Sequence, residues 1–257
     1  MNNPRIANKQ STKNKTNTQQ LTINENFVVV VPAAGVGKRM LASCPKQYLP
    51  LDSQTILSHT ITRLLSHKNI SKVIVAISDN DEYFAKTNLV NNSNVIRVSG
   101  GKERVDSVLN GLQIIENSDW VLVHDAVRPC ITHEDIDKLI SQCIENNCGG
   151  ILAGPVVDTM KRSVKNNVQA YEVAETINRS SLWHAFTPQM FKVDELKEAI
   201  IQTKKQGLEI TDEASAIELS GLPCLLIPGR RDNIKITQPE DLVLADFYLK
   251  QQLTKIT

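Results

Sequence analysis

The chain has 257 residues and carries 29 basic and 28 acidic side chains, for a formal net charge of +1. This balance excludes a strong overall field for nucleic acid, so basic residues are expected to act locally. The five cysteines show no CxxC spacing and no pairing with histidines, which argues against a zinc site or a disulfide framework. No run of residues approaches a membrane span in length. We therefore expect a cytoplasmic protein with no metal ligands of its own and no nucleic-acid or membrane partner.

Residues 1–24 differ in composition from the rest of the chain. They are rich in Asn, Gln, Thr and Lys, contain no acidic residue and show no apolar period. Such a segment buries too little apolar surface to fold, and it lacks the hydrophobic stretch of a secretory signal. A transit peptide is the alternative, because the segment is basic, although Arg and Ser are sparse. The sequence thus predicts a disordered tail at 1–24 and a single domain at 25–257.

From residue 27 onward, apolar patterns alternate between strand and helix. Four valines at 28–31 are typical of a strand buried on both faces, and apolar positions between 105 and 115 recur at helical spacing. Further strands are expected at 73–77, 95–98, 120–123 and 151–157, and further helices at 56–65, 79–90 and 133–146. This alternation predicts an α/β, Rossmann-like fold: a mostly parallel sheet with helices on both faces. Ligands of such sheets bind at the carboxyl ends of the strands.

The alternation stops after residue 157. Residues 159–164 and 168–173 form two short alternating strands around a polar turn, which predicts a β-hairpin arm at about 157–176. A lone hairpin is marginal in water, so we expect it to pack against a second copy of the chain. Beyond the arm we expect helices at 196–206, 213–219 and 240–252, a strand at 224–227, and a strand that ends at about Lys235.

The segment that follows the first strand has the features of a nucleotide loop. Small side chains let a base or a ribose lie against the backbone, and glycines let backbone N–H groups converge on phosphate oxygens. Two cations behind them supply positive charge for a polyphosphate. The expected nucleotide residues here are Ala33, Ala34, Gly35 and Gly37, and the expected catalytic cations are Arg39 and Lys46.

Two common nucleotide loops are excluded by what this segment lacks. A Walker A loop needs Ser or Thr after Gly-Lys, but Arg39 follows Lys38. The dinucleotide fingerprint needs a third small residue where the chain has Met40. The remaining alternative is a generic glycine-containing turn between a strand and a helix.

A second glycine segment, Gly-Gly-Lys-Glu-Arg-Val-Asp-Ser at residues 100–107, joins a strand to a helix. One interpretation is a capped helix N-terminus. The functional interpretation is that Gly101 lets a base approach the backbone while Ser107 offers it a hydroxyl.

Two further segments carry charged residues next to predicted strands. At 124–129, Asp125 follows a buried strand, where one interpretation is an ion pair with Arg128. The functional interpretation is that Asp125 accepts hydroxyls of a polyol or lies next to a metal ion, with Arg128 orienting it. At 176–189, Arg179 stands beside hydroxyl residues and suits a phosphomonoester, which arginine grips with two hydrogen bonds. The alternative for Arg179 is an ordinary exposed arginine.

Taken together, these segments resemble the 2-C-methyl-D-erythritol 4-phosphate cytidylyltransferase family over about residues 27–250. The first match is the pattern Pro-Ala-Ala-Gly-x-Gly-x-Arg-Met followed by Pro-Lys-Gln-Tyr. The matching segments lie at 32–40, 45–48, 100–108, 124–129, 179–189 and 233–242. The chain departs from many members at Asn178 and Phe186, where Asp and Gln are frequent. These departures concern hydrogen bonds that support the site residues, and they leave the assignment of Arg179 unchanged.

The resemblance implies a nucleotide-diphospho-sugar transferase type of fold whose arm makes a homodimer and carries Arg179 to the neighbouring site. It also implies a reaction of CTP with 2-C-methyl-D-erythritol 4-phosphate in isoprenoid precursor biosynthesis, with Mg²⁺ bound mainly through the CTP phosphates. Two alternatives stay open: a ribitol 5-phosphate cytidylyltransferase and a non-catalytic nucleotide-binding protein. The implied nucleotide site adds Gly101, Ser107 and Ala126 to the first loop, and the implied acceptor site comprises Asp125, Arg128, Thr159, Arg179, Thr187 and Lys235.

Overall fold

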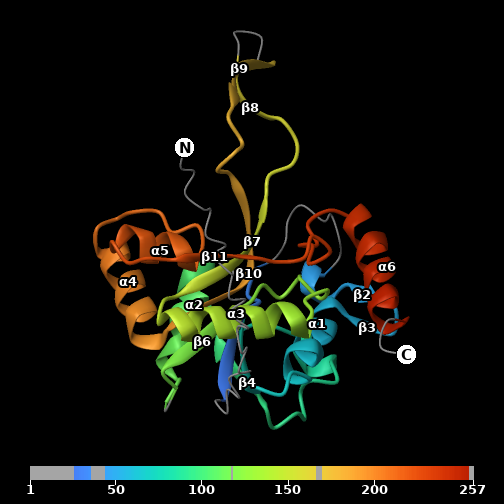
Figure 1. Cartoon of the computed structure of the whole chain (residues 1–257). Coiled ribbons are helices and arrows are strands. Elements are labelled where there is room, and N and C mark those ends of the chain that lie inside the picture. Colours follow the sequence, from blue (N-terminus) through green and yellow to red (C-terminus); the bar gives the residue numbers. More distant parts are fainter. Residues whose placement is uncertain (1–25, 36–43, 117, 166–169, 255–257) are drawn as a thin grey trace, which may run out of the picture.

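The computed structural model describes residues 26–35, 44–116, 118–165 and 170–254, and its centre is a seven-stranded sheet (Figure 1). In sheet order the strands are β11 (Leu225–Pro228), β7 (Gly150–Pro155), β10 (Trp183–Lys192), β6 (Trp120–Val123), β1 (Phe27–Pro32), β4 (Ile70–Ile77) and β5 (Val95–Ser99). β10 runs antiparallel to both of its neighbours, and the other pairings are parallel. The predicted mostly parallel sheet is confirmed.

Helices cover both faces of this sheet because the central strands are apolar on both. In β1, Val29 and Val31 join one buried cluster and Val30 joins the other. The first cluster lies under α1 (Ile56–Leu65) and α3 (His133–Asn146), and the second lies under α2 (Arg104–Gln113), α4 (Val193–Lys205) and α5 (Glu213–Leu219). The last helix, α6 (Glu240–Thr254), contributes Ala245 to a third cluster that includes Ile56 of α1.

The predicted helix at 79–90 is wrong, because the structure has there only a single 3₁₀ turn, η3 (Phe84–Lys86). The side chain of Asp81 accepts hydrogen bonds from the backbone N–H groups of Tyr83 and Phe84, at 3.0 and 2.7 Å. The hydroxyl of Thr87 donates to the carbonyl of Phe84 at 2.7 Å. Local side-chain bonds of this kind compete with the helical backbone pattern, so the segment folds into short turns.

Strand β10, which lies inside the sheet between β7 and β6, is not predicted by the sequence pattern. A proline argues against a central strand because it cannot donate a hydrogen bond to a neighbour. Here Pro188 lies at an irregularity, since the register with β7 shifts between Ala185 and Gln189. The predicted strand ending at Lys235 is not formed either, although the N–H of Ile236 donates to the carbonyl of Val127 at 2.9 Å.

The arm is a two-stranded hairpin of β8 (Met160–Lys165) and β9 (Tyr171–Ile177), as predicted. Figure 1 shows it extending away from the body of the molecule. Every residue of β8 is exposed, and in β9 the apolar residues Tyr171 and Val173 are 72% and 64% exposed. The predicted tail at 1–24 lies outside the described residues. Within the described ranges, no helix has the length and apolar character to cross a bilayer.

Candidate active site

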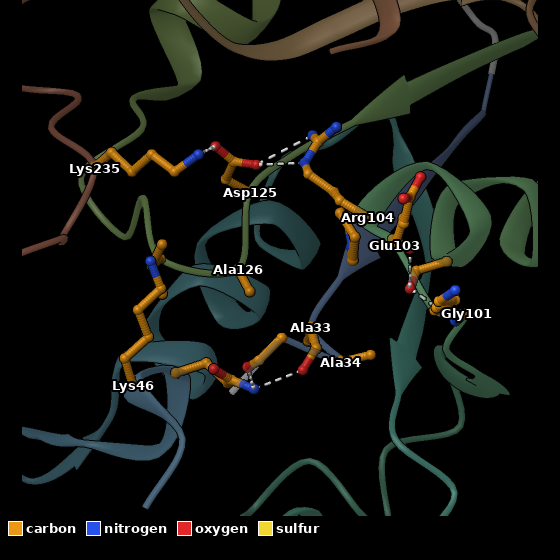
Figure 2. Close-up of a pocket in the computed structure, with 15 residues that line it drawn as sticks. Ala33, Ala34, Lys46, Gly101, Glu103, Arg104, Asp125, Ala126 and Lys235 are labelled. Carbon is orange, nitrogen blue, oxygen red and sulfur yellow. Dashed lines mark hydrogen bonds and ion pairs between the residues drawn. The ribbon is translucent and has the colours of Figure 1, made fainter. Parts of the chain in front are cut away.

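A pocket of about 190 Å³ lies at the carboxyl ends of β1, β5 and β6, where ligands of parallel sheets bind (Figure 2). Its walls come from five segments: the end of β1 with the loop after it, the short helix η2 (Lys46–Tyr48), the loop before α2 with the start of that helix, the loop after β6, and the segment around Lys235. The predicted site residues that line it are Ala33, Ala34, Gly35, Lys46, Gly101, Ser107, Asp125, Ala126 and Lys235.

The first loop is held by Gln47, which the pattern analysis did not assign to the site. Its buried side-chain amide donates to the carbonyl of Ala33 at 2.6 Å and to that of Gly35 at 3.2 Å. Gln47 belongs to η2 (Lys46–Tyr48), so the same short helix fixes the loop and carries Lys46. The Lys46 ammonium donates to the carbonyl of Ile236 at 3.4 Å. Sequence offered one signal for Gln47, its position next to a predicted catalytic lysine.

The two glycines after β5 bring the second loop close to its neighbours. A Cβ on Gly100 would lie 2.2 Å from the Cβ of Ala34, and one on Gly101 would lie 2.0 Å from the Cβ of Asp106. The first loop can therefore approach the second only without a side chain at Gly100, and the chain can turn into α2 only without a side chain at Gly101. The Ser107 hydroxyl accepts a hydrogen bond from the N–H of Gly101 at 2.9 Å, which holds this loop. A direct contact of Ser107 with a base stays a prediction.

Asp125 stands at the centre of a charged cluster, where it is buried. Its carboxylate lies 2.8 Å from Lys235 Nζ, 3.1 Å from Arg104 Nη2 and 3.5 Å from Arg128 Nε. Figure 2 shows Lys235 and Arg104 on opposite sides of it. Burial alone would raise the pKa of Asp125, but the three cations, led by Arg104, hold it well below its usual range. The carboxylate therefore stays ionised at neutral pH and cannot serve as an acid.

A buried hydrogen-bonded chain positions Asp125 from behind. The N–H of Asp125 donates to the Thr187 hydroxyl at 3.0 Å, and that hydroxyl lies 3.1 Å from His124 Nδ1. The Nε2 of His124 lies 3.0 Å from the carbonyl of Arg128, so the ring donates there and accepts from Thr187. Burial lowers the pKa of His124 to about 4, which keeps the ring neutral. Thr187 thus joins β10 to the loop after β6.

The predicted acceptor residues do not all meet in the pocket. Arg128 and Thr187 are buried beside it, and Arg128 donates to the carbonyl of Asn233 at 2.7 Å and lies over the Phe186 ring. Thr159 and Arg179 are exposed at positions that flank the arm, and they are not among the described residues that line the pocket. Gly37 and Arg39 lie outside the described residues.

The site also contains residues of the second glycine segment for which the sequence indicated no role. Arg104 lines the pocket and contacts Asp125, and its neighbours Lys102 and Glu103 complete that wall. Among the described residues, no group of three or more His, Cys, Asp or Glu side chains could hold a metal ion. The chemistry that this arrangement supports is the binding of a charged ligand by cations and by backbone groups of small residues.

Comparison with known proteins agrees with this geometry. Residues 27–251 match the family model described as IspD: 2-C-methyl-D-erythritol 4-phosphate cytidylyltransferase. The chain is 57% identical over 232 residues to the 2-C-methyl-D-erythritol 4-phosphate cytidylyltransferase of Colwellia psychrerythraea, which covers 88% of this chain and 96% of the relative. It is similar to the crystal structure of the Francisella tularensis enzyme of the same name, with a TM-score of 0.74 and 34% identity. That match covers 87% of this chain and 100% of the other.

Proposed function

We propose a cytidylyl transfer reaction for this chain, which belongs to the 2-C-methyl-D-erythritol 4-phosphate cytidylyltransferase family. The phosphate oxygen of 2-C-methyl-D-erythritol 4-phosphate attacks the α-phosphate of CTP. An oxygen–phosphorus bond forms, the bond to the β-phosphate oxygen breaks, and pyrophosphate leaves. The product is 4-diphosphocytidyl-2-C-methyl-D-erythritol, an intermediate of isoprenoid precursor biosynthesis. The observation that carries the proposal is the pocket whose walls combine two glycine-containing loops with Lys46 and Lys235.

The chemistry needs alignment and neutralisation of charge more than proton transfer. The nucleophile is already an anion, so no general base is required. The nucleotide lies along Ala33–Gly35 and the Gly101 loop, where backbone N–H groups and small side chains allow close approach. Lys46, together with Arg39 from the segment that precedes it in the sequence, stabilises negative charge on the α-phosphoryl oxygens and on the departing pyrophosphate.

Asp125 organises the acceptor side of the site. Because it stays ionised, it can accept hydroxyl hydrogen bonds of the alditol while it holds Lys235 at 2.8 Å. Lys235 keeps 40% of its side chain exposed and can turn its ammonium group toward the acceptor phosphate. Thr187 acts on the acceptor through Asp125, because its hydroxyl accepts a hydrogen bond from the backbone N–H of Asp125.

Mg²⁺ would be held through the phosphates of CTP rather than by a protein cage. Three cations already surround the carboxylate of Asp125, which leaves it poorly suited as a metal ligand. When bound, the ion neutralises part of the polyphosphate charge.

We further propose that the arm completes the acceptor site in a homodimer. Thr159 and Arg179 are exposed in the single chain, and the arm presents Tyr171 and Val173 to solvent. A two-fold dimer would cover these apolar side chains and bring Arg179 to the partner's pocket.

We propose the cytoplasm as the location, supported by five cysteines that are all free.

The decisive experiment is turnover of CTP by the purified full chain with each candidate acceptor. Pyrophosphate release and product mass are measured with 2-C-methyl-D-erythritol 4-phosphate, with ribitol 5-phosphate and without acceptor. We expect kcat/KM for the methylerythritol substrate to exceed that for ribitol phosphate by at least about tenfold. The reverse preference would assign the ribitol reaction, and CTP binding without turnover would assign a non-catalytic role. Lys46→Ala, prepared in parallel, controls for contaminating activity.

A further inference from the structure

Arg104 joins the pocket to a second buried carboxylate, that of Glu213 at the start of α5. Its guanidinium donates to both oxygens of Glu213, at 2.6 and 3.1 Å, and to Asp125 Oδ1 at 3.2 Å through Nε. Only 1% of the Glu213 side chain is exposed. A carboxylate buried to this extent is costly unless it is paired, so the two-oxygen contact with Arg104 accounts for its position.

Glu213 is itself held by the central strand β10. Gln189 donates to Asp212 Oδ2 at 2.9 Å and accepts from the N–H of Ala214 at 2.9 Å, which fixes the residues on either side of Glu213. Two residues earlier on the same strand, Thr187 accepts from the N–H of Asp125. One strand therefore sets the position of both carboxylates that Arg104 bridges.

The contact with Glu213 limits which oxygens of Asp125 the guanidinium of Arg104 can reach. An arginine that faced Asp125 alone would compete with Lys235 for the two carboxylate oxygens. With Glu213 in place, Arg104 has its Nη1 on Glu213 and meets Asp125 at Oδ1, while Lys235 meets Oδ2. The two cations thus occupy different oxygens of one carboxylate, and Figure 2 shows them on opposite sides of it.

We propose that Glu213 is a positioning residue of the active site, which acts by holding Arg104 so that Asp125 and Lys235 keep their places toward the acceptor. This inference rests on the proposed function. Glu213 is not among the residues lining the pocket in the described part of the chain, so its effect on turnover passes through Arg104. Loss of its charge should weaken use of the acceptor more than binding of CTP.

A double-mutant cycle tests this directly with Glu213→Gln, Arg104→Gln and the double variant. We expect each single change to lower kcat/KM for the acceptor about tenfold or more, and the double variant to be no worse than Arg104→Gln within about threefold. The dissociation constant of CTP, measured by calorimetry, should change less than about threefold in Glu213→Gln. Glu213→Asp, which keeps the charge, should restore part of the activity. Glu218→Gln, an exposed position on the same helix, serves as the matched control and should match wild type.

Several results would overturn the proposal. Losses that multiply in the double variant would show that Glu213 acts independently of Arg104. A lower melting temperature with unchanged kinetic constants would show a purely structural role. If Glu213→Gln fails to fold, the same cycle run with Glu213→Asp decides the question by the same criterion. A wild-type chain that does not turn over 2-C-methyl-D-erythritol 4-phosphate would instead defeat the proposed function, which separates the two failures.

Discussion

The pocket and the arm differ in how firmly the chain holds their side chains. In the pocket, the buried Asp125 forms ion pairs with cations from three segments of the chain. On the arm, the apolar Val173 is 64% exposed. The loops of the pocket are each held by a side chain from another element: Gln47 of η2, Ser107 of α2 and Thr187 of β10. The arm has its own cross-strand pairing, and it extends beyond the body in Figure 1.

This difference between the pocket and the arm suggests separate roles for them in the proposed reaction. The loops proposed to bind the nucleotide are positioned by side chains of the same chain. Thr159 and Arg179, which are expected to contact the acceptor, flank the arm, and the exposed apolar side chains of the arm favour association. We therefore expect changes in the pocket to abolish chemistry outright and changes in the arm to act through assembly.

The largest effect is expected for Lys46→Ala. Its positive charge is worth most as charge develops on the phosphates, so kcat should fall about a hundredfold or more while the KM for CTP changes much less. Steady-state kinetics with saturating acceptor measures this. A kcat within a few-fold of wild type would remove Lys46 from the catalytic role.

A charge on the arm should separate the copies of the chain without disturbing the pocket. Val173→Asp places a carboxylate among the exposed apolar residues, so we expect mostly monomer and a loss of activity of about tenfold or more, since charges are depleted at interface cores. Sedimentation velocity and turnover at the same concentration test this. Val173→Thr, which keeps the shape, is the matched control. A dimer that persists with full activity would contradict a dimerising arm.

Mixing two inactive variants tests whether Arg179 acts in its own chain's pocket or in the partner's. If Lys46 acts in its own pocket and Arg179 acts in the partner's, refolding Lys46→Ala and Arg179→Ala together yields mixed dimers with one intact site. Random pairing makes half of the dimers mixed, so activity should recover to roughly a quarter of wild type. No recovery beyond that of the separate variants, despite proven exchange of subunits, would place Arg179 in its own chain's site.

The last prediction is a pH dependence of stability that is confined to the body and leaves the chemistry of turnover aside. The pKa of His124 is about 4 in the folded chain and about 6.5 when unfolded, so the unfolded state binds more protons between these values. The free energy of unfolding should therefore fall as pH drops from 6.5 to 4, by about 3 kcal/mol from this group. Denaturant unfolding across this range should show a shallower pH dependence in His124→Asn. The exposed His184→Asn is the control, and an unchanged slope in His124→Asn would contradict the assignment.

The sequence by itself determined most of the elements that carry the site. The valine run of β1, the helical period of α2 and the alternation of the arm are local patterns, and local patterns record which faces are buried. Most of the predicted pocket residues also follow from the sequence, because glycines, small residues and cations cluster directly after strands whose carboxyl ends meet at one edge. The predicted helix at 79–90 failed for a local reason as well, since the side chain of Asp81 competes for backbone N–H groups.

The tertiary structure alone decided the partners of the charged and polar residues. Arg104 and Glu213 are 109 positions apart, and Asp125 and Thr187 are 62 apart, so no spacing rule links them. Both links depend on β10. The sequence does not predict this strand because Pro188 argues against a strand inside a sheet. The structure accommodates the proline at an irregularity of the pairing with β7. The hydrogen bonds of Thr187 and Gln47 inside the fold have the same physical reason. A buried hydroxyl or amide must find a hydrogen-bond partner, and only the folded chain determines which backbone group lies within reach.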